Sequence, residues 1–170
     1  MSTPALIMLI GRPGSGKSYL GRLIAARLGL PIIQTDLIRK RLFPEPRYTG
    51  PESGAVYDEA HRRLRLGLRA GQSLIFDATN LSERQRRNVY QIADQARAGL
   101  VLVLAVAPTE VIHRRLDGRQ VGLDPLDQSE ADWQIYRKMG PSDPIARPHL
   151  VINTALELNQ AVEVIAARAM

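Results

Sequence analysis

The residues with the clearest chemical meaning lie near the N-terminus, where positions 11–18 read GRPGSGKS. This segment fits the pattern G-x-x-x-x-G-K-[ST], in which glycines let backbone N–H groups approach a chain of phosphates. A chance glycine-rich turn could match it, but an apolar run precedes it and an amphipathic segment follows it, as a phosphate-binding loop requires. We therefore expect a nucleotide site whose loop is formed by Gly11, Pro13, Gly14, Ser15 and Gly16.

The last two residues of this segment carry reactive side chains. The ammonium group of Lys17 is expected to reach the β- and γ-phosphates, and the hydroxyl of Ser18 is expected to bind Mg²⁺. The expected ligands are therefore ATP and Mg²⁺.

A carboxylate and a guanidinium group follow the second predicted strand, residues 31–34. Asp36 is a candidate general base for a substrate hydroxyl, because phosphoryl transfer needs a group that accepts this proton. It could instead cap the helix that follows, and the two roles are compatible. Arg39 lies one helical turn further on the same side, where it could hold an anionic group of the acceptor or be a solvated helix charge.

Three polar residues mark the end of the third predicted strand, residues 73–77. In an open parallel sheet, ligands bind beyond the carboxyl ends of the strands. Asp77 is thus a candidate for the metal side of the site, although a turn-forming aspartate has the same sequence signature. Thr79 and Asn80 come next and are candidates for substrate binding.

Residues 117–128 have the composition of a mobile lid, with two glycines, one proline and three aspartates. A lid arginine can stabilise the charge on the transferring phosphoryl group. Arg119 is the first candidate and Arg115 the second, and solvated arginines at a helix end are the alternative.

The remaining candidates have structural interpretations. The three histidines, His61, His113 and His149, are isolated from one another and from any carboxylate pattern. Trp133 and Tyr136 lie three apart, a spacing that favours core packing over base stacking. Several arginines at 62–69 and 84–87 could follow a phosphate backbone, but arginine-rich helix faces are usually solvated.

Alternating apolar runs and amphipathic segments must position these residues. Strands are predicted at 5–10, 31–34, 73–77, 100–106 and 150–152, each followed by a helix. Capping patterns place helix starts at Ser82, Thr109, Ser129 and Thr154, where Thr154 pairs with Glu157. Proline and glycine predict loops at 43–54 and 140–149. Strand–helix alternation of this kind predicts an α/β fold with a mostly parallel sheet.

Composition narrows the functional classes. The chain has 170 residues, which suits a single domain over 1–170, and its net charge of +6 favours anionic partners. The absence of cysteine excludes disulfides, zinc–thiolate sites and cysteine nucleophiles. No apolar run approaches the length of about 20 residues that a bilayer span needs. We expect a cytoplasmic protein with no membrane association and no obligate protein partner.

Taken together, GRPGSGKS, the pair Asp36 and Arg39, and the run DATNL from Asp77 resemble the kinase domain of phage-type polynucleotide 5′-hydroxyl kinases. They are also similar to the wider group of small P-loop kinases that includes zeta toxins. The likeness covers nearly the whole chain and implies a P-loop three-layer sandwich, with a five-stranded parallel sheet in the order 2-3-1-4-5 and a short lid. In the polynucleotide kinases the third motif reads Asp-Thr-Asn, whereas Ala78 intervenes here.

The resemblance implies a role for each matching residue. Lys17 and Ser18 contact the nucleotide and metal, and Asp36 acts as the general base. Arg39 contacts a phosphate of the acceptor, Arg119 touches the donor phosphates, and Asp77 helps to organise the metal site.

Three classes of function remain open. The first is an ATP-dependent kinase that transfers the γ-phosphoryl group to a hydroxyl, either of a polynucleotide 5′-end or of a small molecule such as a sugar, nucleotide or antibiotic. The second is a switch that hydrolyses ATP without an acceptor, and the third is a nucleic-acid-binding module with a vestigial loop. The sequence contains no N-K-x-D motif, which argues against GTP as the nucleotide. The complete Gly16-Lys17-Ser18 argues against a glycine-rich loop that has lost its function.

Overall fold

The apolar runs form one parallel sheet in the computed structural model, which describes residues 3–127 and 130–170. Within that part of the chain the sheet has five strands in the order β2-β3-β1-β4-β5, as predicted. The strands are β1 (Ala5–Ile10), β2 (Ile32–Gln34), β3 (Leu74–Asp77), β4 (Gly99–Val106) and β5 (Leu150–Asn153). Every residue of the central strand β1 is buried, which explains its unbroken apolar sequence.

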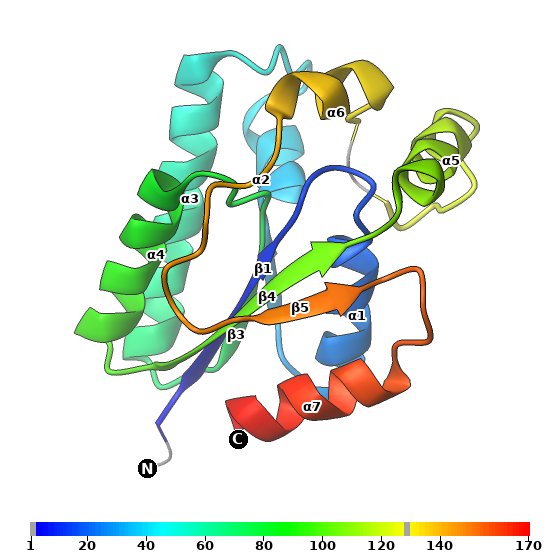
Figure 1. The fold of residues 1–170 in the computed structure, drawn as a ribbon. Coiled ribbons are helices and arrows are strands. Elements are labelled where there is room, and N and C mark those ends of the chain that lie inside the picture. Colours follow the sequence, from blue (N-terminus) through cyan, green and yellow to red (C-terminus); the bar gives the residue numbers. More distant parts are fainter. Residues whose placement is uncertain (1–2, 128–129) are drawn as a thin grey trace.

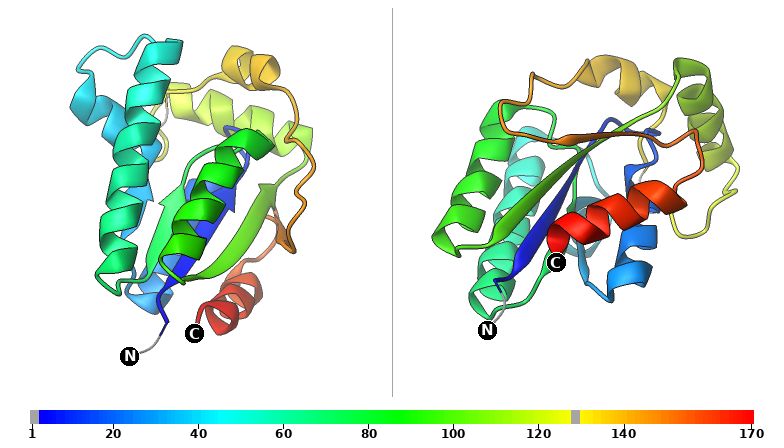
Figure 2. Two further views of the ribbon diagram at one scale, coloured as in Figure 1. Left: turned by 90° about the vertical axis from the view of Figure 1, so that its left-hand side faces the viewer. Right: turned by 60° about the horizontal axis from the view of Figure 1, so that its bottom comes forward.

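Helices cover both faces of the sheet (Figure 1). One face carries α3 and α4, and the other carries α1 and α7, while α5 and α6 lie at the end of the sheet where β1 meets the glycine-rich loop (Figure 2). The helices are α1 (Lys17–Leu28), α2 (Thr35–Leu42), α3 (Gly50–Arg69), α4 (Glu83–Gln95), α5 (Thr109–Gln120), α6 (Trp133–Met139) and α7 (Asn159–Ala169).

Alternate residues of the strands separate two cores. Leu6 and Met8 of β1 pack with α3 and α4, whereas Ile7 and Leu9 pack with α1 and α7. This alternation follows from the pleat, which sends successive side chains to opposite faces. Both faces of the sheet are therefore packed against helices, and the carboxyl ends of its strands are fixed in place at one edge, where a site can form.

The two predicted loops at 43–54 and 117–128 are shorter in the structure because helices extend into them. The predicted loop 43–54 ends early, because Thr49 caps α3 through the backbone N–H of Glu52 and Pro51 fits in the first turn. Helix α5 continues to Gln120, one turn beyond the predicted lid boundary at 117. Gly118, which suggested a loop, lies inside this helix, where a Cβ atom would come within 2.9 Å of Leu123 Cδ1.

The predicted helix caps have different outcomes. Ser82 and Gln85 form the expected capping box. Thr109 is the first residue of α5 and Pro108 holds the cap position, while Ser129 and the last lid residue, 128, lie outside the described residues. Helix α6 begins at Trp133, with Asp132 as its cap. The predicted box at Thr154 and Glu157 is wrong, because α7 begins at Asn159 and the Thr154 side chain bonds elsewhere.

Arg86 is a structural residue of α4 and not a solvated one. Its side chain is fully buried and forms an ion pair with Glu83. The same guanidinium group donates to backbone carbonyls of Asn80, Leu81, Asp143 and Pro144 at 2.8–3.0 Å. It therefore joins the segment after β3 to the loop before β5 and cannot follow a phosphate backbone.

Replacing Arg86 with alanine is expected to lower the free energy of unfolding by about 3 kcal/mol, because buried carbonyls and the Glu83 carboxylate lose their donor. Urea denaturation measures this change. Arg87→Ala is the matched control, since Arg87 is on the same helix with a largely exposed side chain, and its effect should stay below about 0.5 kcal/mol. Equal effects of the two variants would contradict the structural role of Arg86.

His61 of α3 is buried between two aromatic rings. Its ring lies 5.9 Å from that of Tyr57 and 6.4 Å from that of Phe76, and within the described residues its Nε2 has no hydrogen-bond partner. Burial, with a contribution from the charge of Arg65, lowers the pKa of His61 below its ordinary value. The imidazole is therefore a neutral part of the core, as the sequence analysis suggested.

The free energy of unfolding is expected to fall as the pH drops below about 6.5, the ordinary pKa of histidine. In this range the unfolded chain binds a proton at His61 that the folded chain does not bind, so stability rises with pH. Denaturation at a series of pH values measures the slope, which His61→Phe should reduce and His149→Gln should not. A slope unchanged by His61→Phe would contradict this explanation.

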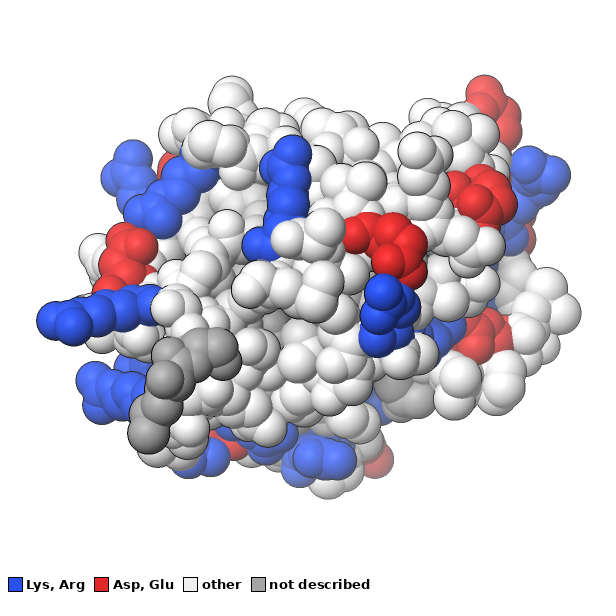
Figure 3. All heavy atoms as spheres, turned by 90° about the horizontal axis from the view of Figure 1, so that it is seen from below, with Lys and Arg blue, Asp and Glu red and all other residues white. Residues whose placement is uncertain are grey.

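The described helices include none that is both long enough and apolar enough to span a bilayer. On the face opposite the glycine-rich loop, basic side chains are separated by acidic and uncharged ones (Figure 3). The excess positive charge therefore forms no continuous stripe on this face.

Candidate functional site

The predicted phosphate-binding loop connects β1 to α1, as its sequence requires. Gly14 and Gly16 have φ angles of 77° and 82°, a region that favours glycine. Gly16 is the cap residue of α1, and no acidic residue lies in the first turn. The N-terminus of α1 thus presents its positive end beside the loop, where an anion is favoured.

Lys17 points from the start of α1 toward the end of β3. Its Nζ lies 3.4 Å from Oδ1 of Asp77, whose Oδ2 accepts a hydrogen bond of 3.0 Å from Gln34. Burial opposes the charge on Lys17, but the carboxylates of Asp77 and Asp36 outweigh it, so the pKa of the ammonium group is raised. Lys17 therefore stays charged at neutral pH in a nearly buried position.

Asp36 lies in the first turn of α2 and is half-buried. It does not cap this helix, because Gln34 holds the cap position. Within the described part of the chain its carboxylate makes no hydrogen bond, and its charge acts on Lys17. The structure thus brings together a free carboxylate, a buried ammonium group and the glycine-rich loop.

Arg39 is buried between α2 and α3. Its Nη1 lies 3.6 Å from a carboxylate oxygen of Glu52, and its Nη2 donates to the Ser53 hydroxyl at 3.2 Å. The ring of Tyr48 covers the guanidinium group at 4.7 Å. Arg39 therefore lies on the Asp36 side as predicted, but it is anchored to the beginning of α3.

Thr79 and Asn80 follow β3 at the same edge. Asn80 is fully buried and its side-chain amide donates to the Leu9 carbonyl at 2.9 Å, so the side chain ties β3 to β1. The half-buried Thr79 interacts with the hydroxyl of Tyr57, a residue that the sequence analysis did not single out. Tyr57 is close enough to Lys17 and Asp36 for their charges to act on it.

The two candidate lid arginines occupy different positions. Arg119 donates from Nε to Asp127 at 2.6 Å and from Nη1 to the Ala131 carbonyl at 2.8 Å, and its charge reaches Lys17. Arg115 instead donates to the carbonyl of Gly14 in the loop. Arg119 thus faces the Lys17 side of the site from α5, whereas Arg115 lies against the loop.

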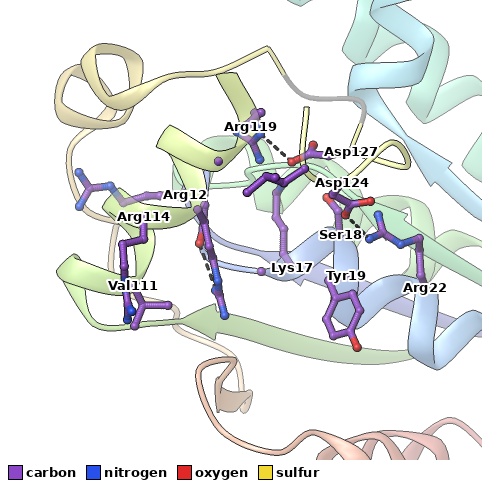
Figure 4. Close-up of a pocket in the computed structure, with 15 residues that line it drawn as sticks. Arg12, Lys17, Ser18, Tyr19, Arg22, Val111, Arg114, Arg119, Asp124 and Asp127 are labelled. Atoms are coloured by element: carbon purple, nitrogen blue, oxygen red, sulfur yellow. Dashed lines mark hydrogen bonds and ion pairs between the residues drawn. The ribbon is translucent and has the colours of Figure 1, made fainter. Parts of the chain in front are cut away.

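A cavity of about 470 Å³ lies between the glycine-rich loop, α1 and α5. Figure 4 shows Lys17, Ser18 and Arg119 around it. The segment of residues 121–127, here called the lid loop, closes one side, and its Asp124 forms a 2.7 Å ion pair with Arg22 of α1. This cavity is large enough for a small ligand such as a nucleotide.

An aromatic stack joins α5 and α6 to the loop. The Arg12 guanidinium group lies 3.6 Å from the centre of the Tyr136 ring and donates to the Tyr136 carbonyl. Tyr136 stacks on Trp133 at 4.9 Å, and the His113 ring meets Trp133 edge-on at 4.5 Å.

The packing role expected for Trp133 and Tyr136 is confirmed. His113 is not isolated from carboxylates, because it pairs with Asp117 at 3.3 Å, a contact that their spacing of four residues could have indicated.

Sequence comparisons agree with this loop and fold. Residues 6–139 match a family described as an AAA domain. An uncharacterised protein of Mycobacterium tuberculosis is 30% identical over 166 residues, which cover 86% of this chain and 33% of that protein. The chain therefore spans about a third of the length of the curated relatives it matches first. A shikimate kinase of Rhizobium leguminosarum is 30% identical over 121 residues, 66% of this chain and 57% of that protein.

Solved structures show the same fold. A kinase candidate from Chloroflexus aurantiacus superposes with a TM-score of 0.80 at 23% identity, covering 99% of this chain and 100% of the other. The APS kinase of Mycobacterium tuberculosis has a TM-score of 0.74 at 14% identity, covering 99% and 98%. Since the family match includes the glycine-rich loop, Asp36 and Asp77 and spans most of the sequence, the chain belongs to the AAA domain family of P-loop, kinase-like proteins.

Proposed function

We propose that this protein is a kinase that transfers the γ-phosphoryl group of ATP to a hydroxyl group of a small molecule. The observation that carries the proposal is the carboxylate of Asp36, which makes no hydrogen bond within the described residues, acts electrostatically on Lys17 and does not line the nucleotide cavity. A carboxylate in this position can accept the proton of a hydroxyl that does not belong to the nucleotide. The names of the relatives support the proposal, since a shikimate kinase and an APS kinase are among them.

In the proposed reaction Lys17 and Arg119 stabilise negative charge on the phosphates, and Asp36 accepts a proton. Lys17 binds the β- and γ-phosphates, and Arg119 approaches the transferring group from α5. Asp36 accepts the proton of the acceptor hydroxyl as its oxygen attacks the γ-phosphorus and the bond to the bridging oxygen of ADP breaks. The products are ADP and a phosphorylated acceptor.

The donor atoms near Lys17 fit a magnesium ion. Asp77 Oδ1 is buried and lies 3.4 Å from the ammonium group of Lys17, and Lys17 and Ser18 both line the nucleotide cavity. No group of three or more acidic or histidine side chains suited to a metal occurs in the described part of the chain. This small set suits Mg²⁺, which usually keeps water and phosphate oxygens as ligands and uses one or two protein oxygens. Bound there, the ion would neutralise phosphate charge.

The basic helices give little support for a polynucleotide acceptor. Arg86 is buried in the fold, and Arg62 and Arg63 both pair with Glu59 at 2.7 Å. On the acceptor side, Arg39 lies beneath Tyr48, whose hydroxyl is 3.4 Å from Glu130. Because these arginines are buried or paired, they do not offer an open track for a nucleic-acid strand.

The proposal is tested with labelled ATP and a panel of acceptors: sugars, hydroxy acids, nucleosides, aminoglycosides and 5′-hydroxyl oligonucleotides. We expect label to pass to a small hydroxyl compound, and we expect Lys17→Ala to abolish this while Lys138→Ala, a change at an exposed lysine, does not. Transfer to oligonucleotides that weakens steeply with salt would establish the polynucleotide alternative. Release of phosphate unaffected by any acceptor would favour the ATP-hydrolysing switch.

A further inference from the structure

Two side chains from distant parts of the chain hold the outer side of the glycine-rich loop. Thr154 directly follows β5, and its backbone N–H donates to the Val106 carbonyl at 2.8 Å. Its buried hydroxyl donates to the Ser15 carbonyl at 2.5 Å. Arg115 of α5 donates from Nη1 to the Gly14 carbonyl at 3.2 Å. Two successive carbonyl groups of the loop are therefore held by side chains.

The same two side chains also hold each other. Arg115 donates from Nη1 to the Thr154 hydroxyl at 2.9 Å and from Nη2 to the Thr154 carbonyl at 2.8 Å. The Thr154 oxygen thus accepts from Arg115, and its own proton is donated to Ser15 at 2.5 Å, a shorter contact than the one to the Val106 carbonyl at 3.3 Å. Neither side chain can turn away without losing several bonds, so this is a fixed support and not a mobile contact.

The hydrogen bond to the Ser15 carbonyl also fixes the direction of the next backbone N–H group, that of Gly16. In a planar trans peptide the carbonyl of one residue and the N–H of the next point in opposite directions. Because Thr154 holds the Ser15 carbonyl, the N–H of Gly16 must point away from Thr154. Gly16 also lines the cavity beside Lys17 and caps α1, where N–H groups can bind a phosphate.

The closeness of the packing explains why residue 16 is glycine. A Cβ atom on Gly16 would lie 2.6 Å from the Thr154 hydroxyl oxygen and 2.9 Å from Arg115 Nη1. The positive φ angle adds a second reason. The sequence motif alone requires a glycine here, but the structure identifies the two side chains that leave no room for any other residue.

Arg115 contributes charge as well as hydrogen bonds. Its hydrogen-bond acceptors, Gly14 and Thr154, are neutral oxygens, and the described residues include no carboxylate within 4.0 Å of its guanidinium group. Burial and the neighbouring charge of Arg114 lower the pKa of Arg115, yet an arginine remains protonated at neutral pH. A positive charge without a neutralising partner is thus fixed beside the loop.

We propose that Thr154 and Arg115 are positioning residues that hold the glycine-rich loop in its phosphate-binding conformation before a nucleotide arrives. Arg115 then supports the loop, and of the two candidate lid arginines Arg119 is the one that acts on the transferring group. This inference rests on the proposed function only in taking the loop as the nucleotide site. It extends that function by assigning a role to the segment after β5, which the motif does not include.

The test compares Thr154→Val, which removes the hydroxyl at nearly constant size, with Thr154→Ser, which keeps it. Isothermal titration with ATP and with inorganic tripolyphosphate should show that the valine variant binds both about tenfold more weakly, the usual cost of one hydrogen bond. The serine variant should bind like the original protein. An equal loss for both ligands is expected because the support acts on phosphate and not on the base.

A second measurement separates positioning from general damage to the fold. In protein labelled with ¹⁵N-glycine and free of nucleotide, the Gly16 amide resonance should shift in Thr154→Val and return in Thr154→Ser. An unchanged resonance and unchanged ATP binding in the valine variant would overturn the inference, as would equal weakening in the serine variant. Failure of the original protein to bind ATP or tripolyphosphate would instead overturn the proposed function, and the resonance would still decide the role of Thr154.

Discussion

Replacing Asp36 with asparagine is expected to lower kcat for phosphoryl transfer by about 10²–10⁴-fold while the Kd for ATP stays nearly the same. Asparagine has the size of aspartate but cannot accept the proton of the acceptor hydroxyl. The carboxylate makes no hydrogen bond within the described residues and lies outside the nucleotide cavity, so its loss should disturb neither α2 nor ATP binding. Rapid-quench measurement of transfer and titration of ATP provide the two quantities.

Asp58→Asn is the matched control for this experiment, because Asp58 lies on the neighbouring helix α3 with an exposed side chain. Its kcat should stay within about twofold of the original, as expected for a surface substitution. Equal loss of ATP binding and transfer in Asp36→Asn would assign Asp36 to the nucleotide site. Unchanged transfer would remove it from the reaction.

Replacing Arg119 with alanine is expected to lower kcat by about 10³–10⁵-fold, the range found where an arginine stabilises charge on a transferring phosphoryl group. Lysine at the same position should recover only part of the rate, since it lacks the planar fork. Arg137→Ala, a change at an exposed arginine of α6, should have little effect. Single-turnover kinetics at saturating ATP separates this effect from binding.

Arg119 also pairs with Asp127, so its loss could act by loosening the lid loop. Asp127→Asn distinguishes the two explanations, because it weakens the ion pair and keeps the guanidinium group. If Arg119 acts on the phosphoryl group, Asp127→Asn should retain kcat within about tenfold. A loss as large as that of Arg119→Ala would show that the contact between the two residues is what matters.

Local sequence signals predicted the parts of the fold that depend on local physics. The apolar run at 5–10 predicted β1 with the boundaries that the structure has, and the amphipathic segment after the loop predicted a helix there. The rule that ligands bind beyond the carboxyl ends of parallel strands predicted that Asp36 and Asp77 would lie near Lys17. Each of these inferences needs only the neighbouring residues and the general geometry of a sheet.

Two of the errors occurred where a side chain bonds to a distant segment. Thr154 has the local pattern of a helix cap, yet its hydroxyl bonds to Ser15, 139 positions away. Arg86 has the pattern of a solvated charge, yet its guanidinium group reaches carbonyls near Asp143. Sequence spacing carries no information about such partners, because the fold must first bring the two segments together.

The stack of His113, Trp133 and Tyr136 beside Arg12 also has an optical consequence. The chain contains one tryptophan, Trp133 of α6. Its indole contacts His113 of α5 and stacks on Tyr136, whose ring lies against Arg12 of the glycine-rich loop. Indole emission depends on the polarity and the quenching groups around the ring. The intrinsic fluorescence of the unlabelled protein therefore comes, for its tryptophan part, from this single junction, with no second indole to obscure it.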